Sequence, residues 1–384
     1  MSGQKFLNIS SFKTVSRCWL PINQTIKAGQ NNNLRYFSSK QRCINFNNIK
    51  DAHLVANDGV LSGEEAIKAG SSEEIFEPTI FSSEEIHTAG PWLRMKIACG
   101  QLCSLSSLKD NSRVVIKLIK QSILSKVEVL FLPEATDYIL KDAKELITLA
   151  SKTQQDFLTP IQKELKLLNE RNKSQLKLAI GIHEPTSLEK VRNIQIWINE
   201  AGLIEQKYAK IHLFDINIPN GPNLKELNSV EPGNSILSPF AVRNWNIGFA
   251  ICYDIRFIEM TLKLRNLGAN LITFLRPFTT KTGEAHWLEL GRARAIDSQC
   301  YIVMAAQCGE HQNGSDKKRV SYGQSIIIDP WGEVIARGAK YSDPRSLDHQ
   351  GDYYQLVTAA ISHELVEQVR SNLPVFSHRR PDVY

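Results

Sequence analysis

Residues 244–253 read NWNIGFAICY, and the chain continues as DIRF into a helical pattern that Gly268 stops. The apolar run has the length of a strand and the helical pattern covers residues 256–267, so a buried strand is expected to pass directly into a helix here. Strands of similar character are expected at residues 95–101, 127–132, 176–184, 191–199, 269–275 and 301–307. Strands that alternate with helices predict an α/β fold, with a mixed sheet covered by helices.

Local signals indicate where several elements begin and end. A helix is expected to start at Asn111 or Ser112, and the helical stretch 141–172 is expected to break near Pro160. A further helix is expected at residues 283–298, and the DPWG sequence at 329–332 predicts a hairpin turn. Because no run approaches the roughly 18 to 20 apolar residues of a membrane-spanning helix, no membrane partner is expected.

The first 50 residues contain eight basic and no acidic residues. This composition is typical of mitochondrial targeting segments, and Arg35, three residues before a cut after Phe37, resembles a processing site. We therefore expect a mitochondrial protein, with the cytoplasm as a second location. The alternative interpretation is a basic tail without a targeting signal.

Residues 51–91 have the opposite charge, with nine acids and a single lysine. SSEEI occurs twice, at 71–75 and 82–86, among Gly, Ser and Pro residues, so a disordered linker is predicted. One folded domain is expected at residues 92–384. The formal net charge of +6 nearly vanishes once residues 1–37 are removed, and no nucleic-acid partner is therefore expected.

Three predicted segments end in reactive side chains. Glu134 follows the strand at 127–132, Lys210 lies in YAKIH, and Cys252 ends the strand at 244–253. Loops at strand ends gather into one cleft in α/β folds, so these groups are expected to converge. A thiol at a helix start is a candidate nucleophile, with a carboxylate as its base and an ammonium to stabilise negative charge. Taken singly, each is more often a structural or surface residue.

The seven cysteines include no C-x-x-C pair and no zinc spacing, which indicates free thiols. Motifs of dinucleotide-binding, P-loop and serine-hydrolase proteins are absent from the sequence. The sequence therefore gives no support to these three classes of protein.

The segments around these residues resemble the three signatures of the nitrilase (carbon-nitrogen hydrolase) superfamily. They are FLPEA at 131–135, YAKIHLFD at 208–215 and FAICYDIRF at 249–257. The resemblance extends through TGEAHW at 282–287, RARAID at 292–297, DPWG at 329–332 and LPVF at 373–376. Within the superfamily the chain is most similar to the Nit branch, and PNGP at 219–222 with HRRPD at 378–382 looks like its deaminated glutathione amidases.

The resemblance implies an α-β-β-α sandwich that forms a homodimer and uses no metal or other cofactor. It also implies a cysteine thioester intermediate, with Cys252 as nucleophile, Glu134 as general base and Lys210 as the stabiliser of the oxyanion. Glu226 matches a second carboxylate that positions Lys210. The backbone N–H of Tyr253 is expected to donate to the oxyanion.

The function implied by the resemblance is hydrolysis of a small anionic amide. Deaminated glutathione would yield 2-oxoglutarate and cysteinylglycine, and an ω-amidase acting on α-ketoglutaramate is the alternative. Arg256 is either a clamp for a substrate carboxylate or a structural partner of Glu259. Arg276 and Pro277 depart from the branch pattern, in which a small hydroxyl residue lines the pocket. That departure motivates a third hypothesis, a pseudoenzyme or scaffold.

Overall fold

The computed structural model describes residues 54–56, 59–61, 94–140, 143–217, 223–311, 319–343 and 351–383. The chain divides into two compact units, Met1–Glu84 and Glu85–Tyr384. In the first unit β1 (Leu54–Ala56) pairs antiparallel with β2 (Gly59–Leu61), where the sequence had indicated no strand. The remaining residues of the predicted targeting segment and linker, and the PNGP sequence at 219–222, lie outside the described residues.

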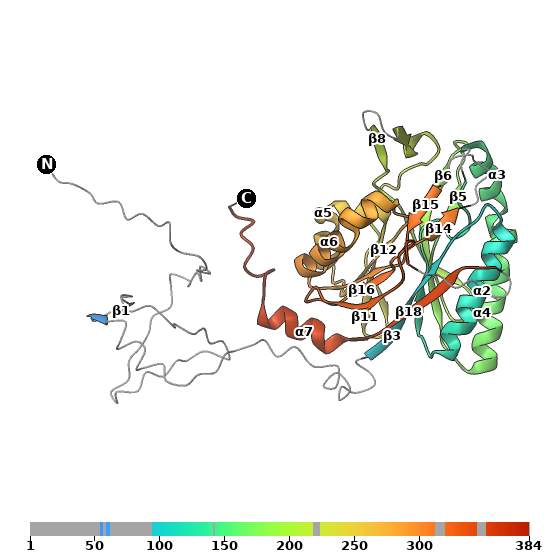
Figure 1. Cartoon of the computed structure of the whole chain (residues 1–384). Coiled ribbons are helices and arrows are strands. Elements are labelled where there is room, and N and C mark those ends of the chain that lie inside the picture. Colours follow the sequence, from blue (N-terminus) through green and yellow to red (C-terminus); the bar gives the residue numbers. More distant parts are fainter. Residues whose placement is uncertain are drawn as a thin grey trace. The chain divides into compact units, whose positions relative to one another are not determined.

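Two six-stranded sheets form the framework of the second unit (Figure 1). The first has the order β18 (Tyr354–Ser362), β3 (Arg94–Leu102), β4 (Val129–Phe131), β5 (Lys177–Pro185), β6 (Val191–Ile198) and β7 (Ile204–Ala209). The second has the order β10 (Phe240–Val242), β11 (Trp245–Ile251), β12 (Leu271–Leu275), β13 (Tyr301–Met304), β16 (Ile326–Ile328) and β17 (Val334–Arg337). Each sheet has three parallel central strands, namely β3, β4 and β5 in one and β11, β12 and β13 in the other.

Helices cover the outer face of each sheet, so the layers are α-β-β-α, as the resemblance implied (Figure 1). The first sheet is covered by α2 (Leu108–Leu124), α3 (Ala143–Thr153), the π-helical turn η2 (Gln154–Leu158) and α4 (Thr159–Asn172). The second is covered by α5 (Ile258–Asn266) and α6 (Thr280–Ser298). α7 (His363–Asn372) continues from β18, and two small ladders join β8 (Asp215–Asn217) to β9 (Asn223–Lys225) and β14 (Cys308–His311) to β15 (Arg319–Tyr322).

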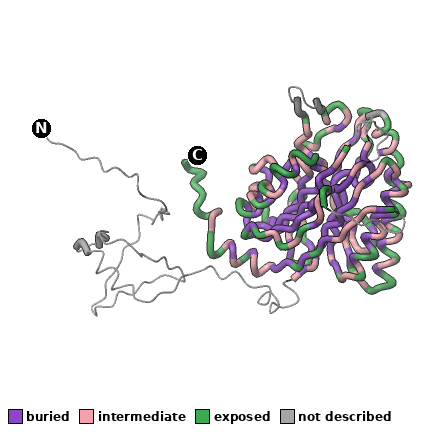
Figure 2. Tube along the Cα trace, viewed as in Figure 1, coloured by how far each residue is buried: buried purple, intermediate pink, exposed green. Residues whose placement is uncertain are grey.

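The main core lies between the two sheets and is the buried centre of the domain in Figure 2. Trp197 on β6 and Trp245 on β11 are at most 1% exposed. A buried hydrogen bond from Gln195 Nε2 to Thr273 Oγ1 (2.9 Å) joins the sheets directly. Burial of large apolar side chains from both sheets stabilises their face-to-face packing, which holds the strand ends in fixed relation.

Several predicted boundaries agree with the structure, and others differ. The hairpin is confirmed, because Asp329 Oδ1 accepts bonds from the backbone N–H groups of Trp331 and Glu333 between β16 and β17. The break near Pro160 is also confirmed, as the turn η2 just before it. The predicted start of α2 is wrong, because Ser107 caps the helix by accepting from Asp110 N (3.3 Å). Asn111 is buried and binds the backbone of Leu105 and Asp137 instead.

The strand at 244–253 does not pass directly into an α-helix. Residues 252–256 form the five-residue 3₁₀ turn η4 (Cys252–Arg256), and α5 begins only at Ile258. The expected stop is confirmed, because Gly268 has φ +99 just after α5. Within the described residues, no helix is both long and apolar enough to span a membrane.

Candidate active site

Glu134 lies in a tight loop at the end of β4 and is 3% exposed. The next residue, Ala135, has φ +55, a left-handed backbone conformation that is rare for a residue with a side chain. Gln307 Nε2 donates to the carbonyl oxygens of Glu134 and Ala135, both at 3.1 Å, and Gly181 N donates to the Pro133 carbonyl at 3.1 Å. These hydrogen bonds hold the loop that bears Glu134 in one conformation.

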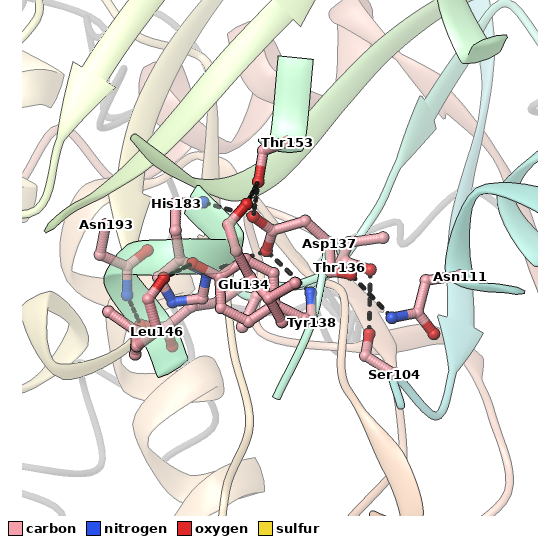
Figure 3. Close-up of polar contacts among 12 residues, drawn as sticks. Ser104, Asn111, Glu134, Thr136, Asp137, Tyr138, Leu146, Thr153, His183 and Asn193 are labelled. Atoms are coloured by element: carbon pink, nitrogen blue, oxygen red, sulfur yellow. Dashed lines mark hydrogen bonds and ion pairs between the residues drawn. The ribbon is translucent and has the colours of Figure 1, made fainter. Parts of the chain in front are cut away.

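A network of buried hydrogen bonds contacts the loop that bears Glu134 (Figure 3). Asp137 accepts from the backbone N–H of His183 (2.8 Å) and lies 2.9 Å from its Nδ1. Burial lowers the pKa of His183, but the neighbouring Asp137 charge and hydrogen bond raise it above the ordinary value overall. Ser104 Oγ donates to the Thr136 carbonyl (3.1 Å) on the other side of the loop.

Gly181 on β5 allows this loop to lie close to the sheet. A Cβ at this position would lie 2.6 Å from both Glu134 Cα and the Pro133 oxygen. These are backbone atoms, which cannot avoid the clash by a side-chain rotation. Gly181→Ala is therefore expected to displace Glu134 and lower kcat/KM by about 100-fold. Gly248→Ala is the matched control, because the nearest atoms to its Cβ would be those of the Leu264 and Ala269 side chains, at 3.3 Å or more, and none of them is a backbone atom. Equal activity of the two variants would contradict this account.

Lys210 follows β7 and links two carboxylates. Its Nζ lies 3.1 Å from Glu134 Oε1 and 2.9 and 3.0 Å from the two Glu226 oxygens. Lys210 is 2% exposed, and Phe214 N donates to Glu226 Oε2 at 2.6 Å. The structure therefore brings Glu134, Lys210 and Glu226 together, although 76 residues separate the first two. Asn193 Nδ2 also donates to Glu134 Oε1.

Cys252 is the first residue of η4, immediately after β11, and its φ is +51. This left-handed conformation turns the chain sharply at the end of the strand. Asp254 fixes the turn, because its Oδ2 accepts from Ile251 N and from the Tyr208 hydroxyl, both at 2.8 Å. Its Oδ1 lies 2.7 Å from His212 Nδ1. Asp254 thus joins the Cys252 turn to the segments that flank Lys210.

The electrostatic surroundings of Cys252 differ from the sequence expectation. Burial and the Glu134 carboxylate raise the pKa of the thiol, while the charges of Lys210 and Arg276 lower it only partly. The expected helix N-terminus is a turn of five residues, too short to give the field of a long helix. The resting group is therefore a thiol, and it needs a base to become a nucleophile.

The Lys210 side chain remains charged in this site. Burial by itself lowers its pKa, but the charges of Glu134, Cys252 and Glu226 raise it well above the usual value. An ammonium group held between two carboxylates is a fixed positive charge beside the thiol. This arrangement is suited to stabilise an oxyanion that forms nearby.

Three arginines lie around the thiol. Arg276 is 2% exposed, and a side-chain hydrogen bond and charge link it to Cys252. Arg319 is exposed, yet surrounding protein lowers its pKa while the charges of Glu134 and Cys252 act to raise it. The charge of Arg319 therefore acts together with the charges of the site. Arg256 is partly buried, and its Nη2 lies 3.2 Å from His286 Nδ1, with no ion pair to Glu259 among the described residues.

Tyr253 is half-buried beside Cys252, and its ring packs edge-on against Phe214 and Phe257. Four further residues interact with the site and were not predicted from the sequence, namely Asn193, Asp254, Gln307 and Arg319. Only Asp254 had a local signal, its place two residues after Cys252. In the described part of the chain, no cluster of three or more His, Cys, Asp or Glu side chains has the arrangement of a metal site.

A separate cavity of about 480 Å³ is lined in part by Asp110, Glu310, Asp343 and Asp352. Its lining does not include Glu134, Lys210, Glu226 or Cys252, so this cavity is separate from the site described above.

The family model described as carbon-nitrogen hydrolase matches residues 96–371. This range includes Glu134, Lys210, Glu226 and Cys252. The chain belongs to the carbon-nitrogen hydrolase family. It is 39% identical over 290 residues to the "Probable hydrolase nit2" of Schizosaccharomyces pombe, covering 75% of this chain and 98% of that protein. It is 37% identical over 295 residues to the "Deaminated glutathione amidase" of Bos taurus, covering 75% of this chain and 83% of that protein.

Solved structures agree with this membership. The Caenorhabditis elegans NitFhit protein has a TM-score of 0.66 and 34% identity, covering 76% of this chain and 66% of that chain. Saccharomyces cerevisiae Nit3, described as a nitrilase superfamily member, has a TM-score of 0.60 at 24% identity, covering 76% of this chain and 100% of that chain, and shows the shared fold. The protein is therefore an amidase of the nitrilase superfamily, which disfavours the scaffold hypothesis.

Proposed function

We propose that this amidase hydrolyses deaminated glutathione through a thioester on Cys252. The observation that carries the mechanism is the buried contact of Lys210 with Glu134 and Glu226 beside the thiol. The substrate rests on the name of the Bos taurus relative and on the arginines around the site, because guanidinium groups bind carboxylates in paired hydrogen bonds.

The proposed reaction has two steps. Glu134 takes the thiol proton as Cys252 Sγ attacks the amide carbon, while Lys210 and the N–H of Tyr253 stabilise the oxyanion. Glu134 then gives the proton to the departing nitrogen, and the C–N bond breaks to leave a thioester. Water deprotonated by Glu134 attacks this thioester, which releases 2-oxoglutarate and restores the thiol.

The rival ω-amidase reaction shares the acyl group and differs in the leaving group. Deaminated glutathione releases cysteinylglycine, which carries a carboxylate, whereas α-ketoglutaramate releases ammonia. The exposed Arg319 supports the first substrate, because its charge acts together with those of the site and can attract a leaving group that carries a carboxylate. Such a cation attracts a charged leaving group and has no effect on ammonia.

The test compares both substrates on the full chain, following 2-oxoglutarate, cysteinylglycine and ammonia. We expect a higher kcat/KM for deaminated glutathione. Arg319→Met is expected to raise KM about tenfold for deaminated glutathione and to leave α-ketoglutaramate unchanged. The exposed Arg337→Met on β17 is the control. A higher kcat/KM for α-ketoglutaramate, or an equal effect of Arg319→Met on both, would favour the ω-amidase.

The oligomeric state and the cellular location of the protein are also proposals. We propose a homodimer in mitochondria, with the cytoplasm as a second location. Sedimentation of the purified protein and fractionation of cells test the two proposals.

A further inference from the structure

Arg276 is a buried cation whose hydrogen-bonding groups are incompletely used. It follows β12 directly and is among the largest fully enclosed side chains of the domain. Its Nε and Nη1 atoms are buried and have no hydrogen-bond partner in the protein. Burial lowers the pKa of its guanidinium to about 9. A buried charge with unsatisfied donors is costly, so its presence needs a reason beyond packing.

The backbone fixes Arg276 next to the nucleophile. β11 and β12 are parallel, with Ile251 opposite Leu275, so Cys252 and Arg276 directly follow the ends of two neighbouring strands. Arg276 N donates to the Ala305 carbonyl, and its own carbonyl accepts from Gln307 N, both at 3.0 Å. The position of Arg276 is therefore set by the sheet and does not depend on a mobile loop.

The acids of the site are committed to other groups. Glu134 and Glu226 form their ion pairs with Lys210, and no ion pair joins Arg276 to an acid among the described residues. The guanidinium also lies over the Phe278 ring, which holds it in a plane without satisfying its remaining N–H donors. These donors are free to bind an anionic group that enters the site.

We propose that Arg276 binds a carboxylate on the acyl part of the substrate and makes this enzyme selective for amides of dicarboxylic acids. The inference rests on the proposed function of Cys252 as nucleophile. The leaving nitrogen must lie at Glu134, which comes from the first sheet. Arg276 is 2% exposed and linked to the thiol by a hydrogen bond. The acyl part of the substrate stays bonded to Cys252 in the thioester, so we assign the carboxylate that Arg276 holds to the acyl part. A planar guanidinium binds a carboxylate with two parallel hydrogen bonds.

The kinetic test compares α-ketoglutaramate, which has the acyl carboxylate, with butyramide, which lacks one. We expect Arg276→Met to lower kcat/KM for α-ketoglutaramate by about 10- to 100-fold more than for butyramide, mainly through KM, because the lost charge beside the Cys252 thiol affects both amides alike. Arg276→Lys keeps the positive charge, and its kcat/KM for α-ketoglutaramate is expected to lie between those of the native protein and Arg276→Met. Arg265→Met is the matched control, because Arg265 on α5 is also partly enclosed with an unpartnered Nε but lies outside the site.

A binding test does not depend on turnover. 2-Oxoglutarate is expected to raise the melting temperature of the native protein and to slow alkylation of Cys252 by iodoacetamide, whereas butyramide does neither. In Arg276→Met both effects of 2-oxoglutarate are expected to disappear, and the unliganded variant is expected to melt higher because an unpaired buried charge is removed.

The outcomes separate this inference from the proposed function. If Arg276→Met keeps the preference for α-ketoglutaramate and the protection by 2-oxoglutarate, the role of Arg276 is wrong while the amidase mechanism stands. If the variant hydrolyses both amides faster, Arg276 occludes the pocket and the inference is overturned. If the native protein forms no acyl adduct on Cys252 with any substrate, the proposed function itself fails.

Discussion

Replacement of Cys252 by alanine is expected to lower kcat/KM by at least about 10⁴-fold while the fold is retained. Without the thiol, water must attack the amide directly, and no covalent intermediate divides the reaction into two easier steps. The measurement is turnover of deaminated glutathione, together with mass spectrometry of acid-quenched native protein, which is expected to show an acyl adduct on the Cys252 peptide.

Cys300→Ala is the matched control for this change. Cys300 is fully buried and donates to the Ala269 carbonyl at 3.2 Å, away from the Glu134 and Lys210 groups. In the native protein Cys252 is expected to react faster with iodoacetamide than the other cysteines. Substantial turnover by Cys252→Ala, or equal slow labelling of all cysteines, would contradict a nucleophilic role.

Lys210→Met is expected to reduce kcat by roughly 10³-fold and to destabilise the protein by about 3 to 5 kcal/mol. The ammonium is the cation shared by Glu134 and Glu226, so its removal leaves a buried and a partly buried carboxylate without a positive charge between them. Thermal denaturation measures the stability, and single-turnover kinetics measure acylation.

Two further variants separate the two effects of this lysine. Lys210→Met combined with Glu226→Gln removes one of the opposed charges, and we expect part of the lost stability to return without activity. Lys207→Met on β7, the strand that precedes Lys210, is the control, since Lys207 pairs with Glu184 at the surface and such pairs contribute roughly 1 kcal/mol or less. Full activity in the destabilised Lys210→Met variant would show that the lysine has only a structural role.

The backbone of the site adopts unusual conformations next to both reacting groups. Both Ala135, next to the proposed base, and Cys252, the proposed nucleophile, have positive φ. Residues with side chains adopt this conformation only where the surroundings impose it, and here Gln307 and Asp254 supply the hydrogen bonds that do so. The two reacting groups are thus held by backbone geometry before substrate arrives, which lowers the cost of orienting them.

The sequence by itself determined the alternation of strands and helices, the family and the segments that bear Glu134, Lys210 and Cys252. Apolar periodicity reports which residues are buried, and short motifs report local turns, so both can be read along the chain. The start of α2 was missed because Ser107 and Asn111 are both suitable caps, and only packing decides that Asn111 is buried.

Only the tertiary structure decided which distant side chains meet. The contact of Lys210 with Glu134 depends on the positions of β4 and β7 within one sheet, and the place of Arg276 beside Cys252 depends on the register of β11 against β12. The raised pKa of the thiol likewise arises from burial and from a carboxylate 118 positions away along the printed sequence. Distances and electric fields between separate strands depend on packing in three dimensions, and a linear pattern contains no measure of them.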